Sequence, residues 1–361
     1  MGIRAALLTE LNKALEVRDD FELSDAGPGE VRIRMVASGV CHSDVSFQNG
    51  TVPVPLPSII GHEGAGEILQ VGDGVEHVAP GDSVIISWVP PCGGCYFCNH
   101  HEPHLCKVGL AQAMGVPHFK LGNDVIFQGP GTATFAEETV VQASAAIKVS
   151  KEIPLDVASL IGCGVMTGVG AALNTARVKP GSSCMVIGCG GIGISTIMGA
   201  RAAGAEIIVA VDTVDRKLAW AKQFGATHAI KPEELESLKA DLTEGRGFDY
   251  TFEAVGLGST FETALYSTRS GGTTVMIGMA KTDEKVDLNV HDVFMMERKI
   301  LGSFYGSANV NTDFQRMLDL WKQGKLDLEG MISRRIALDE VNEAFRAMQA
   351  GEVIRSVIDY N

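Results

Sequence analysis

Four of the eight cysteines lie close together, at positions 92, 95, 98 and 106. Cysteines two residues apart can bring their sulfur atoms to one centre with little strain, and the two glycines after Cys92 allow a tight turn. Four thiolates with no open coordination position are typical of a structural zinc site. The alternatives are free buried thiols, a disulfide or an iron–sulfur cluster. The run lacks the Cys-Pro ending of bacterial ferredoxins, which favours zinc.

Three further residues that commonly bind metals lie far apart: Cys41, His62 and Cys163. Each alone is compatible with an ordinary buried side chain, and a lone histidine usually has that role. His62 lies in the run Gly-His-Glu, in which Glu63 follows it directly. The residues next to these three favour a shared role over three separate structural ones. These residues are therefore candidates for a second metal site.

A glycine-rich turn separates two predicted strands, over 182–187 and 206–212. The turn is followed by a predicted helix to about residue 204, and it contains Gly188, Cys189, Gly190, Gly191, Ile192 and Gly193. In this setting the glycines form the strong version of the dinucleotide-binding fingerprint, in which the pyrophosphate meets the positive end of a helix. Asp212 ends the second strand and would accept hydrogen bonds from the adenosine ribose. Its charge repels a 2′-phosphate, so we expect NAD rather than NADP.

The remaining pattern predicts an α/β protein of two domains. Before about residue 160, short alternating strands such as 31–36 predict a mostly β domain of barrel type. After it, strands and helices alternate, which predicts a parallel sheet covered on both faces. Within this part Ser259 is expected to cap a helix to Arg269, and Gly271 and Gly272 to end it. The other expected elements are strands at 249–255, 273–279, 299–304 and 353–358, and helices at 312–323 and 339–350.

These segments resemble the zinc-containing medium-chain alcohol dehydrogenases, whose signature is the histidine and glycine pattern from Gly61 to Val75. The resemblance covers nearly the whole chain, in the family's order. It implies a GroES-like catalytic domain over 1–163 with a structural-zinc lobe at 90–110. It also implies a doubly wound (Rossmann) NAD-binding domain over 164–304, and a segment over 305–361 that returns to the catalytic domain.

The resemblance also assigns roles around the metals. It implies two zinc ions per subunit, with Cys41, His62 and Cys163 on the catalytic one and water or substrate in the fourth place. The four clustered cysteines would hold the structural ion. Asp44 would accept a hydrogen bond from His62 and fix its tautomer. Glu63 would lie behind the metal.

For the reaction, the family implies reversible hydride transfer between an alcohol and NAD, giving an aldehyde or ketone. Zinc acts as a Lewis acid toward the alcohol oxygen. Ser43 would take the alcohol proton. Many relatives carry a histidine where this chain has Ser46, so we expect the proton to leave by another route. Trp88 would narrow the substrate pocket. Besides the glycines and Asp212, the implied NAD contacts are His42, Thr167, Ile192, Lys217, Ile277 and Arg355.

Several alternatives stay open at this point. Oxidation of formaldehyde as a thiol adduct uses the same machinery; Val52 and Leu110 stand where a glutathione-dependent enzyme would carry an acid and an arginine, whereas a mycothiol-dependent version remains compatible. A zinc-bearing nucleic-acid module is another reading of the cysteines alone. A non-catalytic relative is a third, although every expected metal ligand is present.

Composition narrows these classes. Acidic residues outnumber basic ones by 44 to 30, which gives a formal net charge of −14. An acidic surface repels phosphate backbones, which argues against nucleic acid and anionic membranes as partners. No apolar run reaches the ~18–20 residues of a membrane span, and no secretory signal is visible, so a cytoplasmic location is expected. The long loop between Cys106 and Phe135 resembles that of dimeric family members and predicts a homodimer.

Overall fold

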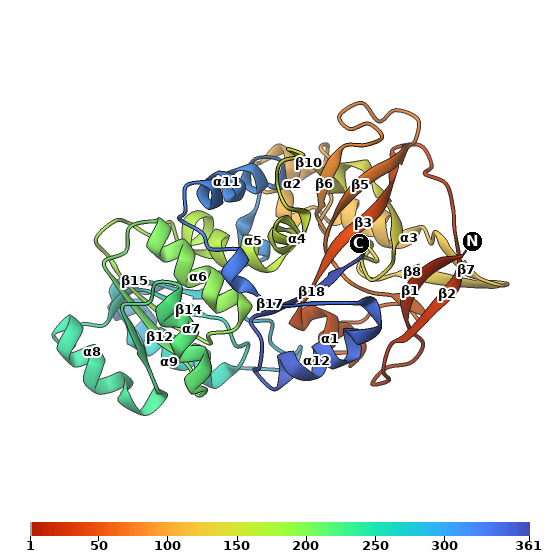
Figure 1. The fold of residues 1–361 in the computed structure, drawn as a ribbon. Coiled ribbons are helices and arrows are strands. Elements are labelled where there is room, and N and C mark those ends of the chain that lie inside the picture. The colour runs from red at the N-terminus through yellow and green to blue at the C-terminus, as the bar shows by residue number, and fades with distance from the viewer. Residues whose placement is uncertain (1) are drawn as a thin grey trace. The chain divides into compact units, whose positions relative to one another are not determined.

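The computed structural model describes residues 2–361, which form two compact units. The first unit contains the chain up to Gly164 together with 309–318 and 328–361. The second contains 165–308 and 319–327. The chain therefore leaves the first unit, builds the second and then comes back (Figure 1).

The first unit contains a small closed barrel of five strands. These are β1 (Ile3–Leu8), β2 (Glu16–Leu23), β7 (Phe119–Leu121), β8 (Asp124–Gln128) and β4 (Ser58–Ile59). Buried side chains such as Phe21, Ile59 and Phe119 form its core. The burial of these apolar side chains from water stabilises the closed arrangement.

A seven-stranded sheet forms the other half of this unit. Its strands are β10 (Ala146–Val149), β6 (Ser83–Ile86), β5 (Glu63–Val71), β3 (Glu30–Val40), β18 (Arg355–Asp359), β17 (Ile332–Ile336) and β9 (Glu138–Gln142). Along β3, Val31, Ile33 and Met35 are buried on one face of the sheet. The arginines between them lie on the other face and pair with acidic residues of the neighbouring strands β9 and β5, as the period of two in a strand requires. β18 from the chain's end pairs with β3 antiparallel (Figure 1).

The helices of this unit are short. They are α1 (His42–Gln48), α2 (Tyr96–Asn99), α3 (Lys107–Gly115), α4 (Leu155–Ser159) and α12 (Val341–Gln349). α11 (Val310–Lys322) begins in the first unit and ends in the second. α12 buries Val341, Phe345 and Met348, which recur at helical spacing, in a core cluster that also includes Val45 and Phe47 of α1.

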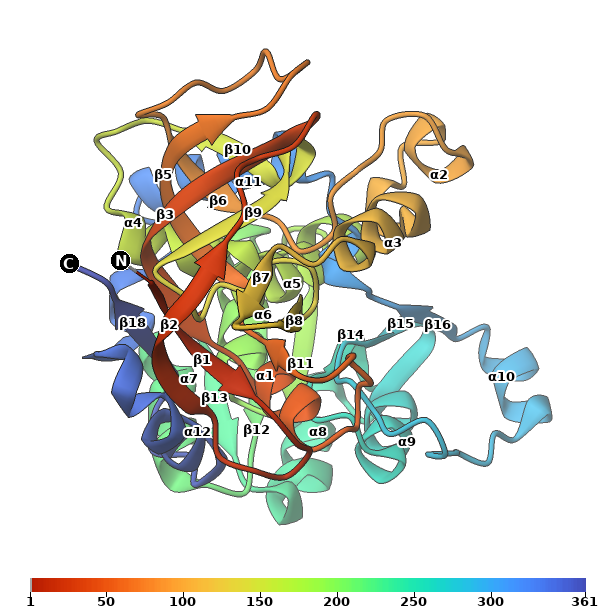
Figure 2. The same cartoon turned by 90° about the vertical axis from the view of Figure 1, so that its right-hand side faces the viewer.

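The second unit is built on a parallel six-stranded sheet. Its strands, in spatial order, are β13 (His228–Ile230), β12 (Ile207–Val211), β11 (Ser183–Ile187), β14 (Phe248–Glu253), β15 (Thr268–Met276) and β16 (Lys299–Gly302), as Figure 2 shows. The helices are α5 (Gly164–Gly170), α6 (Gly191–Ala202), α7 (Asp215–Gln223), α8 (Leu235–Thr243), α9 (Gly258–Ser267) and α10 (Val290–Met296). β11 and β12 are almost wholly buried and apolar, as expected of a parallel sheet covered by helices, whereas β14 carries several polar residues, Glu253 among them.

Both ends of α9 differ from the sequence prediction. Ser259 does not cap α9, because the N-cap is Leu257 and Ser259 already lies within the first turn. Gly271 and Gly272 do not end this helix either; they lie inside β15, which begins directly after α9. The bend at Gly271, where φ is +70°, falls within the strand, so the two glycines mark an irregularity in a strand and not a helix end.

Within residues 2–361, no single helix has the length and apolar character needed to cross a membrane. Two successive helical stretches, 155–162 and 164–175, meet those criteria of length and composition only together, as a bent pair.

Candidate active site

Asp44 connects two of the predicted metal ligands. α1 begins directly after Cys41, and the backbone N–H of Cys41 donates to Oδ2 of Asp44 over 2.9 Å. The other oxygen, Oδ1, accepts from Nδ1 of His62 over 2.8 Å. Because a carboxylate can only accept when ionised, this contact places the imidazole proton on Nδ1 and directs the lone pair of Nε2 away from Asp44.

Four buried side chains, His62 among them, come together on the side of the imidazole that faces away from Asp44. The candidate ligand atoms of Cys41, His62, Glu63 and Cys163 lie within 4.8 Å of one another. Among the described residues, Nε2 of His62 has no hydrogen-bond partner, and both thiols are free. A buried nitrogen lone pair facing two unbridged thiols is costly unless a cation binds there. The donor set therefore fits zinc, with Cys41, His62 and Cys163 as ligands.

The backbone around Cys163 is shaped by close packing. A 3₁₀ turn over Leu160–Gly162 ends at Cys163, and α5 begins at Gly164. A Cβ atom on Gly164 would lie 2.2 Å from the guanidinium of Arg355, so a larger residue here would displace that guanidinium. The amide of Gly164 donates to Oε1 of Glu63 over 2.9 Å. This contact fixes the position of the neighbouring Cys163 relative to the strand that carries Glu63.

Glu63 and Arg355 form a buried ion pair beneath this cluster. Nη2 of Arg355 lies 3.3 Å from Oε1 of Glu63 and 3.8 Å from the sulfur of Cys41. Arg355 is only 3% exposed, so its cation acts first on these buried groups. Sequence reasoning assigned Arg355 to the pyrophosphate and did not find this pair. That role toward the cofactor stays a prediction.

Burial and charge shift the pKa values of these groups in opposite directions. The hydrogen bond from Cys163, with the nearby charges of Arg355 and His62, holds the pKa of the Cys41 thiol well below its ordinary value. The same bond and burial raise the pKa of Cys163. Burial raises the pKa of Glu63 to about 7, although Arg355 opposes the shift. Burial also raises the pKa of Asp44. Burial opposes protonation of His62, but Asp44 and Cys41 raise its pKa.

Aromatic and hydroxyl side chains surround the imidazole. The rings of Phe47 and Trp88 meet His62 edge to face, with centroids 5.9 Å and 6.4 Å from the imidazole. The sequence predicted Trp88 beside the site but missed Phe47, which lies one helical turn beyond Asp44. Oγ of Ser43 lies 3.8 Å from the sulfur of Cys41. Ser46 donates to the backbone carbonyl of His42 over 3.2 Å.

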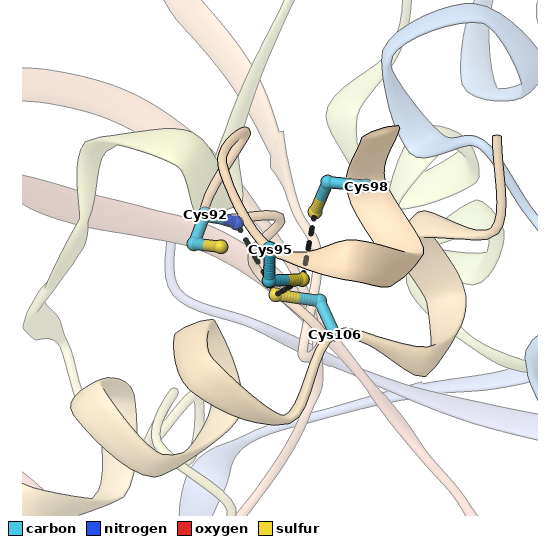
Figure 3. A group of neighbouring side chains, drawn as sticks. All are labelled: Cys92, Cys95, Cys98 and Cys106. Carbon is cyan, nitrogen blue, oxygen red and sulfur yellow. Dashed lines mark hydrogen bonds between the residues drawn. The ribbon is translucent and has the colours of Figure 1, made fainter. Parts of the chain in front are cut away.

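The four clustered cysteines come together in the segment around α2 (Figure 3). The sulfur of Cys95 lies 3.6 Å from that of Cys98 and 3.7 Å from that of Cys106. Tetrahedral zinc with Zn–S bonds of about 2.3 Å needs sulfur separations of roughly 3.8 Å, so the spacing fits the ion. The amides of Cys92 and Gly109 donate to the sulfur of Cys106, which favours its thiolate.

The pKa values of two of these thiols shift oppositely. The backbone amide of Gly94 lowers the pKa of Cys92 to about 7. Burial raises the pKa of Cys98 to about 12. A cation would stabilise both as thiolates, and this lobe is therefore a candidate structural metal centre.

The glycine loop of the second unit lies between β11 and α6. A Cβ atom on Gly193 would come within 1.8 Å of the Gly188 carbonyl, so glycine is required where the helix meets the loop. Gly190 has no atom in reach of such a Cβ and faces open space. The Asp212 carboxylate accepts from the amides of Cys189 and Val214, over 2.8 Å and 2.9 Å. The loop and Asp212 thus form one hydrogen-bonded arrangement at the carboxyl ends of β11 and β12, where dinucleotides bind in such sheets.

The other predicted cofactor residues are distributed over both units. Thr167 lies on α5 next to Gly168. Gly168 is close to the backbone carbonyl of Ile192 in the first turn of α6, and a Cβ atom on Gly168 would lie 2.5 Å from that oxygen. Ile277 directly follows β15 and is buried, and Lys217 lies on α7. His42, the first residue of α1, is exposed and belongs to the first unit, as Arg355 does.

Sequence reasoning missed Glu253, the last residue of β14. This carboxylate is fully buried. Its Oε1 accepts from the amides of Val255 and Gly256 and from the Thr260 hydroxyl, over 2.7 to 2.8 Å. Val255 packs against the position of Gly188 in the glycine loop. Glu253 therefore holds the segment that borders the dinucleotide loop. The sequence feature that could have identified it is an acidic residue at the carboxyl end of a predicted strand of the parallel sheet.

Two family models match the chain. "Alcohol dehydrogenase GroES-like domain" matches residues 27–151, and "Zinc-binding dehydrogenase" matches residues 191–323. Among curated proteins, "Alcohol dehydrogenase class-3" of Drosophila melanogaster is 37% identical over 371 residues, covering 99% of this chain and 97% of that protein.

Solved structures give the same result. An alcohol dehydrogenase zinc-binding domain protein from Burkholderia ambifaria has a TM-score of 0.93 at 30% identity and covers 99% of this chain and 98% of its own. The benzyl alcohol dehydrogenase of Acinetobacter calcoaceticus has a TM-score of 0.93 at 28% identity, with 99% of each chain covered.

Proposed function

The chain belongs to the zinc-containing medium-chain alcohol dehydrogenases, and we propose that it transfers a hydride between an alcohol and NAD at the cluster of Cys41, His62 and Cys163. Family membership makes it a zinc-dependent oxidoreductase, and it confirms the predicted fold class of a GroES-like domain with a Rossmann domain. The observation that carries the site assignment is the buried, unpartnered Nε2 of His62 facing two free thiols.

The residues around the proposed zinc site have separate roles. Zinc bound there supplies a Lewis acid that lowers the pKa of an alcohol, and the nicotinamide supplies the hydride acceptor. Asp44 holds His62 in the tautomer that presents Nε2. Glu63 and Arg355 set the charge behind the ligands. Phe47 and Trp88 flank the imidazole with apolar ring surface, which excludes water and favours a substrate with an apolar body.

We propose that the hydroxyl of Ser43, which neighbours the Cys41 sulfur, takes up the proton of the alcohol. The next position on this face of α1 is Ser46, whose hydroxyl is engaged with the His42 carbonyl and offers no titrating group near neutral pH. The proton therefore passes from Ser43 to the cofactor ribose or to water. His42 and Arg355 are assigned to the pyrophosphate, and Thr167, Ile192, Ile277 and Lys217 to the nicotinamide and ribose portions.

NAD is the proposed cofactor. The Asp212 carboxylate is fixed by two backbone amides at the end of β12, where the adenosine ribose binds in sheets of this kind. A fixed negative charge there repels a 2′-phosphate. We also propose two zinc ions per subunit, the second bound by Cys92, Cys95, Cys98 and Cys106.

A second candidate function is formaldehyde oxidation on a thiol adduct. The similarity to a class-3 alcohol dehydrogenase favours it. Against a glutathione-dependent form, Val52 and Leu110 supply neither an acid nor an arginine, and Val52 packs against the apolar core of the first unit. A mycothiol-dependent form is compatible with these residues.

Within the second unit, one surface supports the proposed homodimer. Val290, Phe294 and Met295 of α10 are 79%, 77% and 60% exposed, and Ile300 of the edge strand β16 is also exposed. Exposed apolar groups beside an unpaired strand edge are typical of an interface.

We place the enzyme in the cytoplasm, because its eight free cysteines and their metal sites need a reducing compartment. The catalytic domain is assigned to 1–163 and 305–361, and the NAD-binding domain to 164–304.

A screen for NADH formation tests the function. Alcohols of graded size, and formaldehyde with no thiol, glutathione or mycothiol, are offered to the zinc-loaded wild type and to the Cys163→Ser variant. We expect turnover of alcohols without a thiol and its loss in the variant, with NADH binding retained. Turnover of formaldehyde only with a thiol would support the second candidate. Equal activity in wild type and variant would contradict both.

A further inference from the structure

A second concave site lies in the unit that carries the glycine loop. A cavity of about 350 Å³ opens where β11, β14 and β16 begin, with Ser182, Asp249 and Lys299 on its wall. The glycine loop follows the opposite, carboxyl end of β11. Strands β11, β14, β15 and β16 follow one another in the sheet (Figure 2). Tyr250, Thr273 and Lys299 are register neighbours across β14, β15 and β16. The cavity is therefore separate from the proposed dinucleotide site.

The lining of this cavity is strongly positive, although the chain as a whole is acidic. Arg177, Lys179, Arg269 and Lys299 line it, with Asp249 as the only carboxylate among its lining residues. These cations come from three segments that are distant in the sequence: the turn before β11, strand β15 and the start of β16. Arg177, Lys179 and Lys299 are exposed and Arg269 is half-buried, so the concavity presents several N–H donors and a positive potential that attracts anions.

Asp249 does not neutralise the group. Its carboxylate accepts from the amide and hydroxyl of Ser183, over 2.8 Å and 2.9 Å, and from Nε of Arg269 over 2.7 Å. Burial disfavours its ionisation, but these bonds lower its pKa, so it stays ionised and is matched with Arg269. Among the described residues, no ion pair engages Arg177, Lys179 or Lys299, and the remaining charge of the cavity is positive.

We propose that this cavity binds a small phosphate monoester. A phosphate dianion carries several acceptor oxygens that Arg177, Lys179 and Lys299 can share, and arginine and lysine are the usual donors to it. The volume lies near the lower end of the roughly 300–1,000 Å³ of small-molecule sites, so there is room for a short organic group beside the phosphate. Tyr250 and Thr273 also line the cavity, and these hydroxyl-bearing residues suit the polar part of such a group.

Isothermal titration calorimetry tests the site. The zinc-loaded protein is first saturated with NADH, so that phosphate cannot bind at the glycine loop. Glycerol 3-phosphate, inorganic phosphate, glycerol and succinate are then titrated at one ionic strength. We expect glycerol 3-phosphate to bind more tightly than inorganic phosphate, and glycerol not to bind. The double variant Lys179→Gln/Lys299→Gln should weaken this binding by about tenfold or more, because two charged contacts are lost.

Lys285→Gln is the matched control, since Lys285 is an exposed lysine of the same unit outside the cavity. It should bind glycerol 3-phosphate as the wild type does. Unchanged NADH affinity and melting temperature in the double variant show that it is folded. No heat with glycerol 3-phosphate, equal affinity in the double variant, or succinate binding as tightly as the phosphate would each overturn the proposal. None of these results depends on which alcohol the enzyme oxidises.

Discussion

The carboxylate of Asp44 accepts from the backbone of Cys41 with one oxygen and from Nδ1 of His62 with the other, over 2.9 Å and 2.8 Å. A single side chain thus positions two groups of the proposed metal site. It links the start of α1 to the residue that precedes β5. The relationship explains why Asp44 is wholly buried although it carries a charge.

The Asp44→Asn variant tests this positioning role. Its amide can accept from only one of the two N–H groups and presents a donor to the other. We expect zinc affinity at the catalytic site to fall by about 10- to 100-fold, as for other groups that orient a metal-binding histidine. Competition with a chromophoric chelator measures it. Asp73→Asn, a change at another acid of the same unit, should leave both zinc ions in place, and an unchanged affinity in Asp44→Asn would refute the role.

Cys106→Ser tests the four-sulfur lobe. Cys106 is buried and is the sulfur on which two backbone amides converge. We expect the variant to retain one zinc ion per subunit where the wild type holds two, and to melt at a lower temperature. Metal analysis and calorimetry measure these. Cys184→Ser, a buried cysteine outside the lobe, should lower stability without loss of zinc. If Cys106→Ser still carries two ions, the lobe is not a zinc site.

The charge of Asp212 should decide between NAD and NADP. Asp212→Asn keeps a side chain of the same shape at the end of β12 but removes the negative charge. We expect the ratio of kcat/KM for NAD over NADP to fall by about tenfold or more, because the repulsion of a 2′-phosphate is lost. Asp215→Asn, at an exposed acid on the first turn of α7, is the control. An unchanged ratio would mean that another group sets the preference.

Glu253 should act on cofactor binding more than on hydride transfer. Glu253→Ala removes the acceptor shared by Val255, Gly256 and Thr260, so the segment beside the glycine loop loses its anchor. We expect the KM for NAD to rise by about tenfold with kcat little changed. Glu253→Gln retains an acceptor oxygen and should be closer to the wild type. A fall in kcat with unchanged KM in both variants would argue for a different role.

The free energy of unfolding should depend on pH partly through His118. Its Nε2 lies 3.2 Å from Glu30 and its Nδ1 2.8 Å from the Ser24 hydroxyl, and burial lowers its pKa although Glu30 opposes the shift. Below about pH 6.5 the unfolded chain takes up a proton that the folded protein resists. The contribution of His118 to the free energy of unfolding should therefore fall as the pH drops from 7 to 5, by at most about 1.4 kcal/mol per pH unit. Glu63, whose pKa burial raises to about 7, contributes in the opposite direction.

Urea unfolding at several pH values measures this slope. Relative to the wild type, His118→Gln should lose less stability as the pH drops from 7 to 5, whereas His291→Gln, at an exposed histidine, should follow the wild type. Parallel curves for the wild type and His118→Gln would show that this histidine does not titrate differently on folding.

Local sequence patterns predicted much of this architecture for a physical reason. Apolar runs such as 183–187, the glycine turn after them and Asp212 are close in the chain, so their geometry follows from short-range rules. The helix end expected at Gly271 failed because the same glycines also occur where a strand bends. Turn signals alone do not distinguish a boundary from an irregularity within a strand.

The contacts that could not be predicted are those made by distant segments. Arg355 meets Glu63 because β18 pairs with β3, a pairing of the two ends of the chain that no local pattern encodes. Phe47 reaches His62 for a similar reason, through Asp44 and the packing of α1. The resemblance named the candidate ligands, but the groups that support them emerge only from tertiary packing.

Anomalous diffraction at the zinc edge, on crystals of the NAD-bound protein, tests the central claim most directly. We predict two peaks per subunit. One should lie among the four clustered sulfurs, and the other should be within bonding distance of the Cys41 and Cys163 sulfurs and Nε2 of His62, with one further position open. A single peak confined to the four-sulfur lobe would contradict the account.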